Sequence, residues 1–277
     1  MSEAGGLYAG TMSGRAGPEV TLSTSSVYPL GPAAAFEIGA RLGYDGIEVM
    51  VLSDPTTQDA EGLRRLVDEH GMPVRSIHAP TLLVTQRVYG SSPWDKIDRS
   101  IELAHELDAD VVVLHPPFRW QKEYATGFVE GVVQREADSG LRLAVENMFP
   151  WRAGKELQVY LPAWDPVPMS YDSVTLDLSH SATSRSDVLA MQAELGSRLA
   201  HVHLADGSGS LKDEHLVPGR GTQPCDEFLR RLGGSGFEGV VAVEVGTRRL
   251  TPEGRDADLR ESLEFARTHL ADGGEFT

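Results

Sequence analysis

Cysteine and long apolar runs are almost missing from this chain of 277 residues. Cys225 is the single cysteine, so no disulfide can form within the chain, and a reducing compartment such as the cytoplasm is the expected location. We expect its thiol to be buried and idle rather than nucleophilic. Because the sequence has no run of about 18 apolar residues, it predicts no membrane span and no membrane partner.

Positive charge is also scarce. Lysine and arginine total 25 against 41 aspartates and glutamates, which gives a formal net charge of −16. Such a surface repels nucleic acid and anionic lipid at long range. A local basic patch would remain compatible with this balance, so the charge disfavours nucleic acid as a partner without ruling it out.

A glycine-rich phosphate loop is missing after the first expected strand. The segment 21–26, Thr-Leu-Ser-Thr-Ser-Ser, contains no glycine. An open doubly wound sheet that binds a dinucleotide normally carries glycines at this turn. The absence therefore favours a closed barrel over the open sheet, which is the alternative for a chain of this pattern.

The dominant feature that is present is an alternation of short β-branched runs with longer amphipathic segments, repeated about eight times. This pattern is typical of βα units and a parallel sheet. The sequence predicts an α/β fold, a single (β/α)₈ TIM barrel. The expected strands are Glu19–Ser23, Gly46–Met50, Val74–His78, Val111–His115, Leu141–Glu146, Ser173–Asp177, Leu199–His203 and Val240–Glu244.

Helices are expected between these strands, and the barrel is expected to cover residues 18–270. Residues 1–17, which lack the apolar stretch of a signal peptide, and residues 271–277 are expected to be flexible tails. The segment 149–171 should be a long loop with a short helix over the barrel mouth. The expected helices are Pro32–Leu42, Gln58–His70, one that starts at Ser92-Pro93, Glu123–Ala137, Ser184–Leu195, Asp226–Leu232 and Asp256–His269.

A polar residue lies at or near the end of most of the expected strands. In a parallel barrel these ends share one rim, where active sites lie. Buried carboxylates and imidazoles so close together need a compensating charge, and a divalent cation supplies it. Mixed ligands of this kind suit Mn²⁺, Co²⁺, Fe²⁺ or Zn²⁺, and Mg²⁺ where water completes the shell. The residues are Glu48, His78, His115, Glu146, Asp177, His203 and Glu244.

Several short motifs resemble the xylose-isomerase-like barrels, a superfamily that includes sugar epimerases, inosose-processing enzymes and endonuclease IV. The resemblance extends from about Glu19 to His269. It implies one metal ion held by Glu146, Asp177, His203 and Glu244. The segments that carry it are Gly43-Tyr44-Asp45-Gly46-Ile47-Glu48, Ser76-Ile77-His78-Ala79-Pro80, Leu114-His115-Pro116, Val145-Glu146-Asn147-Met148, Asp177-Leu178-Ser179-His180 and His203-Leu204-Ala205-Asp206-Gly207.

The resemblance implies an isomerase or epimerase that acts on a small sugar, sugar phosphate or inosose-like ketone through a metal-stabilised enediolate. Glu146 and Glu244 would exchange the proton, and His180 would contact the substrate or a second ion. A dehydratase that uses the same enediolate chemistry is a close neighbour of this hypothesis. Epimerases of ketohexoses usually place an arginine six residues after the metal-binding histidine of the seventh strand. Gly209 occupies that position here, which puts that particular activity in doubt.

Endonuclease IV members of the superfamily suggest a second hypothesis, a phosphoester hydrolase with two or three zinc ions. Their additional ligands match His78, His115, His180, Asp213 and His215, so all nine ligand positions can be filled. A non-catalytic sugar-binding member is the third alternative. Relatives often pair, so a homodimer is compatible with the resemblance.

The candidates for contact with a polyhydroxylated small-molecule substrate lie at the rim and in the loops that follow the strands. Arginines there would hold a phosphate or carboxylate, and tryptophan would form an aromatic wall. For His201, a hydrogen-bonded place in the core is expected, and for Asp206 a cap on its own turn. The substrate-binding candidates are Glu48, His78, His115, Arg119, Arg152, Arg220 and Trp120.

Overall fold

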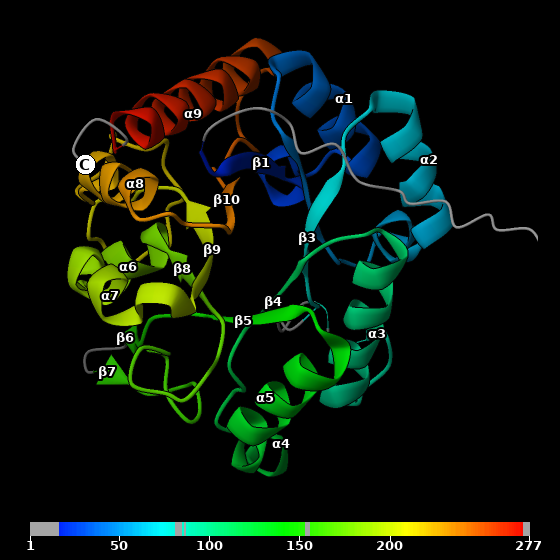
Figure 1. Cartoon of the computed structure of the whole chain (residues 1–277), viewed down its shortest axis with the longest axis vertical. Helices are drawn as coiled ribbons and strands as arrows, with labels where there is room; N and C mark the ends of the chain where they lie inside the picture. Colours follow the sequence, from blue (N-terminus) through cyan, green and yellow to red (C-terminus); the bar gives the residue numbers. More distant parts are fainter. Residues whose placement is uncertain (1–16, 81–84, 86, 153–155, 274–277) are drawn as a thin grey trace, which may run out of the picture.

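The computed structural model of the chain describes residues 17–80, 85, 87–152 and 156–273. Eight parallel strands close into a barrel in the order β1-β10-β9-β8-β5-β4-β3-β2 (Figure 1). This confirms the predicted (β/α)₈ barrel. The barrel strands are β1 (Glu19–Ser23), β2 (Gly46–Met50), β3 (Val74–His78), β4 (Val111–Leu114), β5 (Arg142–Glu146), β8 (Val174–Asp177), β9 (Leu199–Leu204) and β10 (Val240–Val243).

The strands are buried on both faces, which explains their nearly continuous apolar sequences. Three strands match the predicted bounds, and the other five differ by one residue at one end. His115 and Glu244 therefore follow β4 and β10 directly instead of ending them. Both still lie on the rim at the carboxyl ends of the strands, where the candidate site was expected.

Helices surround the barrel (Figure 1). Gly43 and Gly71 adopt left-handed φ values of 85° and 64° and end α1 and α2, as their positions after the predicted helices indicated. Ser92 accepts a hydrogen bond from the Asp95 amide and begins α3, also as predicted. The helices are α1 (Pro32–Leu42), α2 (Ala60–His70), α3 (Pro93–Glu106), α4 (Lys122–Thr126), α5 (Phe128–Ser139), α6 (Leu178–Ser184), α7 (Val188–Leu195), α8 (Cys225–Gly234) and α9 (Pro252–Asp272), with 3₁₀ turns at Thr24–Val27, Pro55–Gln58 and Gly196–Arg198.

One predicted helix is divided in two, and another is preceded by a helix that was not predicted. Gly127 separates α4 from α5, where a single helix over 123–137 was expected. The helix expected over 184–195 is preceded by α6, which starts directly after Asp177, and Arg185 at φ 62° ends α6. The Asp177 carboxylate caps α6 by accepting from the His180 amide at 2.7 Å. This early helix start fixes the metal-ligand candidate Asp177 and His180 relative to each other.

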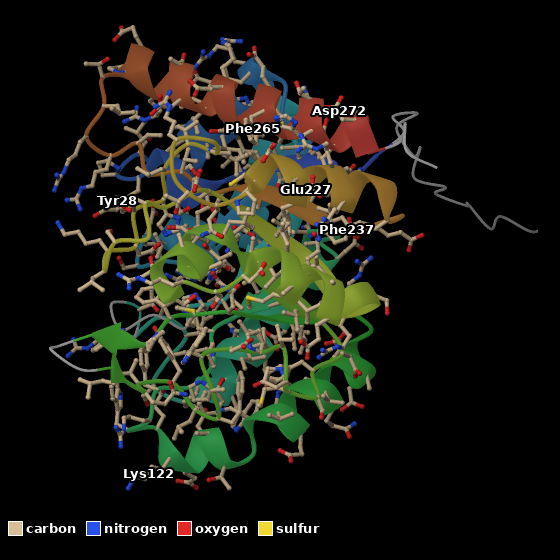
Figure 2. The ribbon with its side chains drawn as sticks, turned by 90° about the vertical axis from the view of Figure 1, so that its left-hand side faces the viewer. Tyr28, Lys122, Glu227, Phe237, Phe265 and Asp272 are labelled. Carbon is tan, nitrogen blue, oxygen red and sulfur yellow. The ribbon has the colours of Figure 1, made fainter. Side chains whose placement is uncertain are left out.

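The stretch 149–171 forms no short helix among its described residues. It contains a small antiparallel pair instead, β6 (Trp151–Arg152) and β7 (Glu156–Leu157). At the other end of the chain, α9 continues to Asp272 (Figure 2), two residues beyond the expected end of the barrel. The tail residues 1–16 and 274–277 lie outside the described part. No helix within the described ranges is long and apolar enough to cross a membrane.

Candidate metal centre

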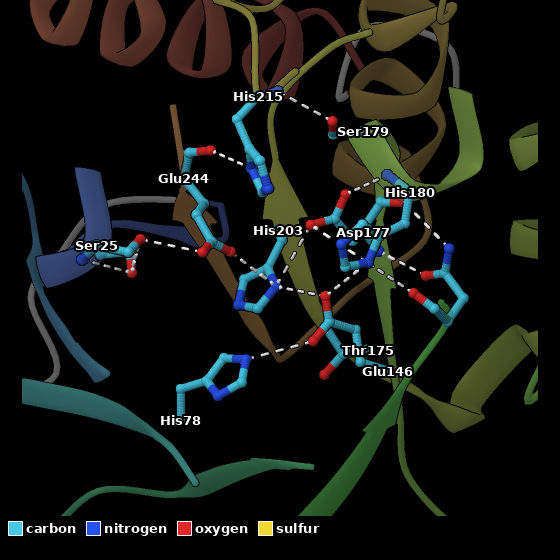
Figure 3. A network of polar contacts seen from close by, with 12 residues as sticks. Ser25, His78, Glu146, Thr175, Asp177, Ser179, His180, His203, His215 and Glu244 are labelled. Atoms are coloured by element: carbon cyan, nitrogen blue, oxygen red, sulfur yellow. Dashed lines mark hydrogen bonds and ion pairs between the residues drawn. The ribbon is translucent and has the colours of Figure 1, made fainter. Parts of the chain in front are cut away.

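Four side chains from four neighbouring strands converge inside the barrel mouth. Glu146 ends β5, Asp177 ends β8, His203 lies in β9 and Glu244 follows β10. We call these four residues the inner cluster (Figure 3). All four are buried, with relative exposures of 1%, 0%, 0% and 9%. The sequence predicted this set, and the barrel brings it together.

Nδ1 of His203 lies at the centre of the inner cluster. It is 3.1 Å from Glu146 Oε1, 3.1 Å from Glu244 Oε2 and 3.7 Å from Asp177 Oδ2. Ligand atoms that share a metal ion at about 2.1 Å lie at comparable distances from one another. Nδ1 of His203 thus has one carboxylate oxygen from each of the three acidic residues at 3.1–3.7 Å.

The chemistry of these donors fits a divalent cation. Within the described part of the chain, no group donates a hydrogen bond to Asp177 Oδ2, although this oxygen is fully buried. A buried carboxylate oxygen without a donor is costly unless a cation compensates it. Asp177, His203 and Glu244 also offer ligand atoms that lie within 4.8 Å of one another. The inner cluster could therefore hold the predicted metal ion.

Electrostatics couple the carboxylates to the surrounding imidazoles. Burial alone would raise the pKa of Glu146, but the charges of His203, His115 and His180 hold it well below its usual value. Burial would lower the pKa of His203, but Glu244, Glu48 and Glu146 raise it well above 6.5. The raised pKa of His203 favours a proton on this ring, which offsets part of the negative charge of the three carboxylates.

Two side chains orient the carboxylates from outside the cluster. Asn147 accepts from the Asp177 amide at 2.7 Å and donates to the Asp177 carbonyl at 3.1 Å, which joins the ends of β5 and β8. Ser25 donates to Glu244 Oε1 at 3.0 Å, which leaves Oε2 facing His203. Sequence reasoning missed Ser25. Its position just after the first strand, on the same rim, was the available signal.

A second group, the outer cluster of His180, Asp213 and His215, lies beside the first. Figure 3 shows its two histidines next to the inner cluster, and His180 Nδ1 is 3.9 Å from Asp177 Oδ2. Asp213 Oδ2 is 3.2 Å from His180 Nε2 and 2.8 Å from His215 Nε2, and its Oδ1 accepts from Ser179 at 2.7 Å. The other ring nitrogens, Nδ1 of His180 and of His215, lie 2.8 Å from the carbonyls of Asn147 and Glu244. Asp213 raises the pKa of His215 to about 10, against the effect of burial.

Two further histidines, His78 and His115, contact the inner cluster through Glu146. Their Nε2 atoms lie 3.3 Å and 2.9 Å from Glu146 Oε2, and their rings meet edge to face at 4.8 Å. Glu146 thus has imidazoles near both of its oxygens. This places both histidines where the predicted substrate contact or an additional metal ion would require them.

Glu48 takes a different place from the one expected. It lies in the middle of β2 with no exposed surface, and its carboxylate contacts His203, His201 and Ser76. Its neighbour His201 is equally buried, with Nε2 at 3.0 Å from Glu48 Oε2, in line with the core role expected for it. Glu48 is therefore located below the metal ligands and not at the rim.

The loop candidates are more dispersed. Arg119 and Trp120 follow β4 and are exposed, and Trp120 stacks on Phe118 at 4.6 Å between ring centroids. The exposed Trp151 lies 6.4 Å from Trp120, so these rings form an aromatic surface beside the mouth. Arg220 is paired with Glu261 and Asp258 of α9. Arg152 lies in β6, and its side chain falls outside the described part of the structure.

Asp206 serves the loop that carries the outer cluster. Its buried carboxylate accepts hydrogen bonds from the backbone amides of Gly207, Gly219, Gly221 and Gln223, at 2.8–3.0 Å. This confirms the expected turn-capping role and extends it to the whole 206–223 loop. Cys225 is buried, and burial raises the pKa of its thiol, as expected for an idle cysteine.

Family comparison agrees with this geometry. Residues 36–269 match the model of the xylose isomerase-like TIM barrel family. The chain belongs to that family. The resemblance drawn from the short motifs is therefore confirmed, and so is the expected fold.

Relatives extend from close to distant. An uncharacterized protein of Mycobacterium tuberculosis is 48% identical over 273 residues, which covers 91% of this chain and 98% of the relative. Fructoselysine 3-epimerase of Shigella flexneri is 24% identical over 237 residues, which covers 77% of this chain and 84% of the relative. The close relative has no described activity, and the distant one is a sugar epimerase.

Solved structures show the same fold. A D-tagatose 3-epimerase-like protein superimposes with a TM-score of 0.68 at 22% identity, covering 93% of this chain and 98% of that protein. A family 2 AP endonuclease from Brucella melitensis superimposes with a TM-score of 0.65 at 18% identity, covering 87% and 96%. At these identities the likeness concerns the fold alone.

Proposed function

We propose that this protein is a divalent-metal-dependent isomerase or epimerase of a small polyhydroxylated ketone or sugar. The observation that carries the proposal is the inner cluster: two glutamates from β5 and β10, each 3.1 Å from the same nitrogen of His203. An epimerase that removes a proton from one face of a carbon next to a carbonyl and returns a proton to the other face can use two such acid–base groups within reach of one substrate. The distant fructoselysine 3-epimerase relative agrees with this class of reaction.

Each residue of the inner cluster has a role in the proposed reaction. Asp177 and His203 would hold the ion, together with Glu146 and Glu244. A bound divalent cation supplies Lewis acidity that stabilises negative charge developing on the substrate oxygens. Glu146 removes the proton next to the carbonyl and Glu244 returns a proton to the substrate. Ser25 orients Glu244 for this transfer through its hydrogen bond to Oε1.

Neighbouring side chains would bind the hydroxyl groups and carbon skeleton of the substrate. His78, His115 and His180 offer ring nitrogens near Glu146, and the exposed rings of Trp120 and Trp151 offer a flat apolar surface in the adjacent loops. Arg119 is exposed beside Trp120, and its guanidinium donates a 3.4 Å hydrogen bond to the Gln158 carbonyl and to no carboxylate of the described residues. It would attract a negatively charged substituent of the substrate.

The proposal is tested by exchange of a substrate hydrogen with solvent deuterium. The metal-loaded protein is incubated with a panel of ketoses, sugar phosphates and inososes in D₂O and followed by NMR. Glu146→Gln, assayed at a Mn²⁺ concentration that saturates the variant, should reduce exchange by about 10²–10⁴-fold, because the general base is lost. Glu136→Gln is the matched control, since Glu136 contacts Ser173 and Leu143 at the opposite end of the strands. Equal exchange by wild type and Glu146→Gln would contradict the assigned role.

A zinc-dependent phosphoester hydrolase of the endonuclease IV type is the second candidate. It is favoured by one observation: Nδ1 of His180 and of His215 each lie 2.8 Å from a backbone carbonyl, so both Nε2 atoms face Asp213. Histidines that bind metals commonly donate their other nitrogen in this way. His78 and His115 also lie close to Glu146, at 3.3 Å and 2.9 Å. The inner cluster, the outer cluster and these two histidines together make up the nine ligand positions of this candidate.

Zinc-loaded protein distinguishes the two candidates when it is assayed with p-nitrophenyl phosphate and with an abasic DNA duplex. A hydrolase should lose its turnover of these substrates in His115→Ala. An isomerase should show no turnover of either substrate above the background measured with Asp177→Asn. The net charge of −16 favours a small phosphate ester over DNA within the hydrolase candidate.

A further inference from the structure

Glu48 lies beneath the metal centre in a closed polar pocket of its own. Its carboxylate has no exposed surface and lies within 3.1 Å of one hydroxyl group and two imidazole nitrogens. Ser76 of the neighbouring strand donates to Oε2 at 2.8 Å, and Ser76 is the register partner of Glu48 between β2 and β3. His201 Nε2 lies 3.0 Å from Oε2, and His203 Nε2 lies 3.1 Å from Oε1. No carboxylate oxygen is left to reach a substrate at the mouth.

His203 is held between this carboxylate and the inner cluster. Its Nε2 faces Glu48, whereas its Nδ1 faces Glu146, Glu244 and Asp177. A neutral imidazole carries one N–H, and an ionised carboxylate only accepts hydrogen bonds. A proton held on Nε2 by Glu48 leaves the lone pair of Nδ1 directed at the three carboxylates.

We infer that Glu48 is a positioning residue that fixes the tautomer and ring orientation of His203, so that Nδ1 is the atom that binds the metal. Ser76 and His201 hold Glu48 in turn, and the His201 ring stands perpendicular to that of His203 at 4.9 Å. Carboxylates that accept from a metal-bound histidine raise its basicity and orient it. This inference rests on the metal site of the proposed function and replaces the substrate-binding role expected for Glu48.

The first test is the affinity of the metal-free protein for Mn²⁺, measured by titration calorimetry. Glu48→Gln should weaken binding by about 10–100-fold, because the amide removes the charged acceptor opposite Nε2. Glu136→Gln, which alters a half-buried carboxyl at the other end of the barrel, should leave the affinity unchanged. Unchanged affinity in Glu48→Gln overturns the inference, and a raised KM in that variant would instead restore Glu48 as a substrate contact.

A second measurement uses only the wild-type protein, so it holds even if Glu48→Gln does not fold. In the ¹⁵N-histidine NMR spectrum of the Zn²⁺-loaded chain, His203 should show a protonated Nε2 and a metal-bound Nδ1. A metal-bound Nε2 overturns the inference while the proposed function stands. A wild-type chain that binds neither Mn²⁺ nor Zn²⁺ overturns the proposed function itself, together with this inference.

Discussion

The inner and outer clusters are built from similar residues, but their carboxylates have different hydrogen-bond partners. In the inner cluster three buried carboxylates surround one imidazole nitrogen, and Asp177 Oδ2 has no hydrogen-bond donor among the described residues. In the outer cluster one carboxylate faces two imidazoles and a hydroxyl, so both oxygens of Asp213 have partners. The outer cluster is also more open, with the side chains of Asp213 and His215 26% and 23% exposed.

The difference separates a site with an excess of buried negative charge from one whose single carboxylate is matched by two imidazoles. Excess buried negative charge in the inner cluster must be compensated, whereas the outer cluster forms a hydrogen-bonded imidazole–carboxylate network without an ion. We therefore expect the inner cluster to hold the tightly bound ion. The outer cluster then serves to bind substrate in an isomerase, and it would hold additional zinc in a hydrolase.

The largest effect on metal affinity is expected from a substitution of Asp177, whose buried Oδ2 has no hydrogen-bond donor among the described residues. Asp177→Asn should weaken Mn²⁺ binding by more than about a hundredfold, because a neutral amide replaces a charged ligand. The metal-free variant should be no less stable than metal-free wild type, since a buried charge is removed. Calorimetry and thermal unfolding measure both quantities. Retained affinity in Asp177→Asn would remove the inner cluster as the metal site.

A smaller effect is expected from pH. Folding raises the pKa of His203 above 6.5, so its contribution to the stability of the metal-free protein is complete below pH 6.5 and is lost as the pH rises through the folded value. Metal binding must displace that proton, so affinity should increase with pH, by about tenfold per unit for each proton displaced. Calorimetry from pH 6 to 8 checks this sign. A constant affinity would show that the metal-free histidine carries no displaceable proton.

The smallest effect on metal affinity is expected from a substitution in the outer cluster. Asp213→Asn should change the affinity of the first Mn²⁺ by less than about threefold, because Asp213 contacts none of the carboxylates of the inner cluster. The same variant should weaken substrate binding, since His180 and His215 lose their common partner. Competition with a chelator measures the first quantity, and KM the second. A loss comparable with that of Asp177→Asn would make the two clusters one site.

The sequence was sufficient to predict the barrel and the inner cluster for a clear reason. Apolar strands that end in a polar residue place these residues on a shared rim, whatever the intervening helices do. The sequence was not sufficient to predict how deep a residue lies within the barrel. Glu48 lies mid-strand, two residues before the end of β2, and only the register with Ser76 shows that it belongs below the mouth.

The side-chain contacts of the loops could not be predicted from the sequence either. Arg220 was expected to face a substrate phosphate, but it pairs with Asp258 and Glu261, residues about 40 positions away in α9. Ser25 was overlooked because its partner Glu244 is 219 residues away. Contacts of this kind depend on how loops close across the barrel and leave no periodic pattern in the sequence. The start of α6 directly after Asp177 was also missed. Asp177 is both the last residue of β8 and the N-cap of α6, so no loop residues mark the change from strand to helix.

Native mass spectrometry of the chain, stripped of metal and titrated with Mn²⁺ and separately with Zn²⁺, tests the contrast between the clusters most directly. We predict one tightly bound ion per chain with either metal, lost in Asp177→Asn and retained in Asp213→Asn. Two or three Zn²⁺ ions bound with equal tightness, and reduced together in Asp213→Asn, would contradict a single-ion centre and favour the hydrolase.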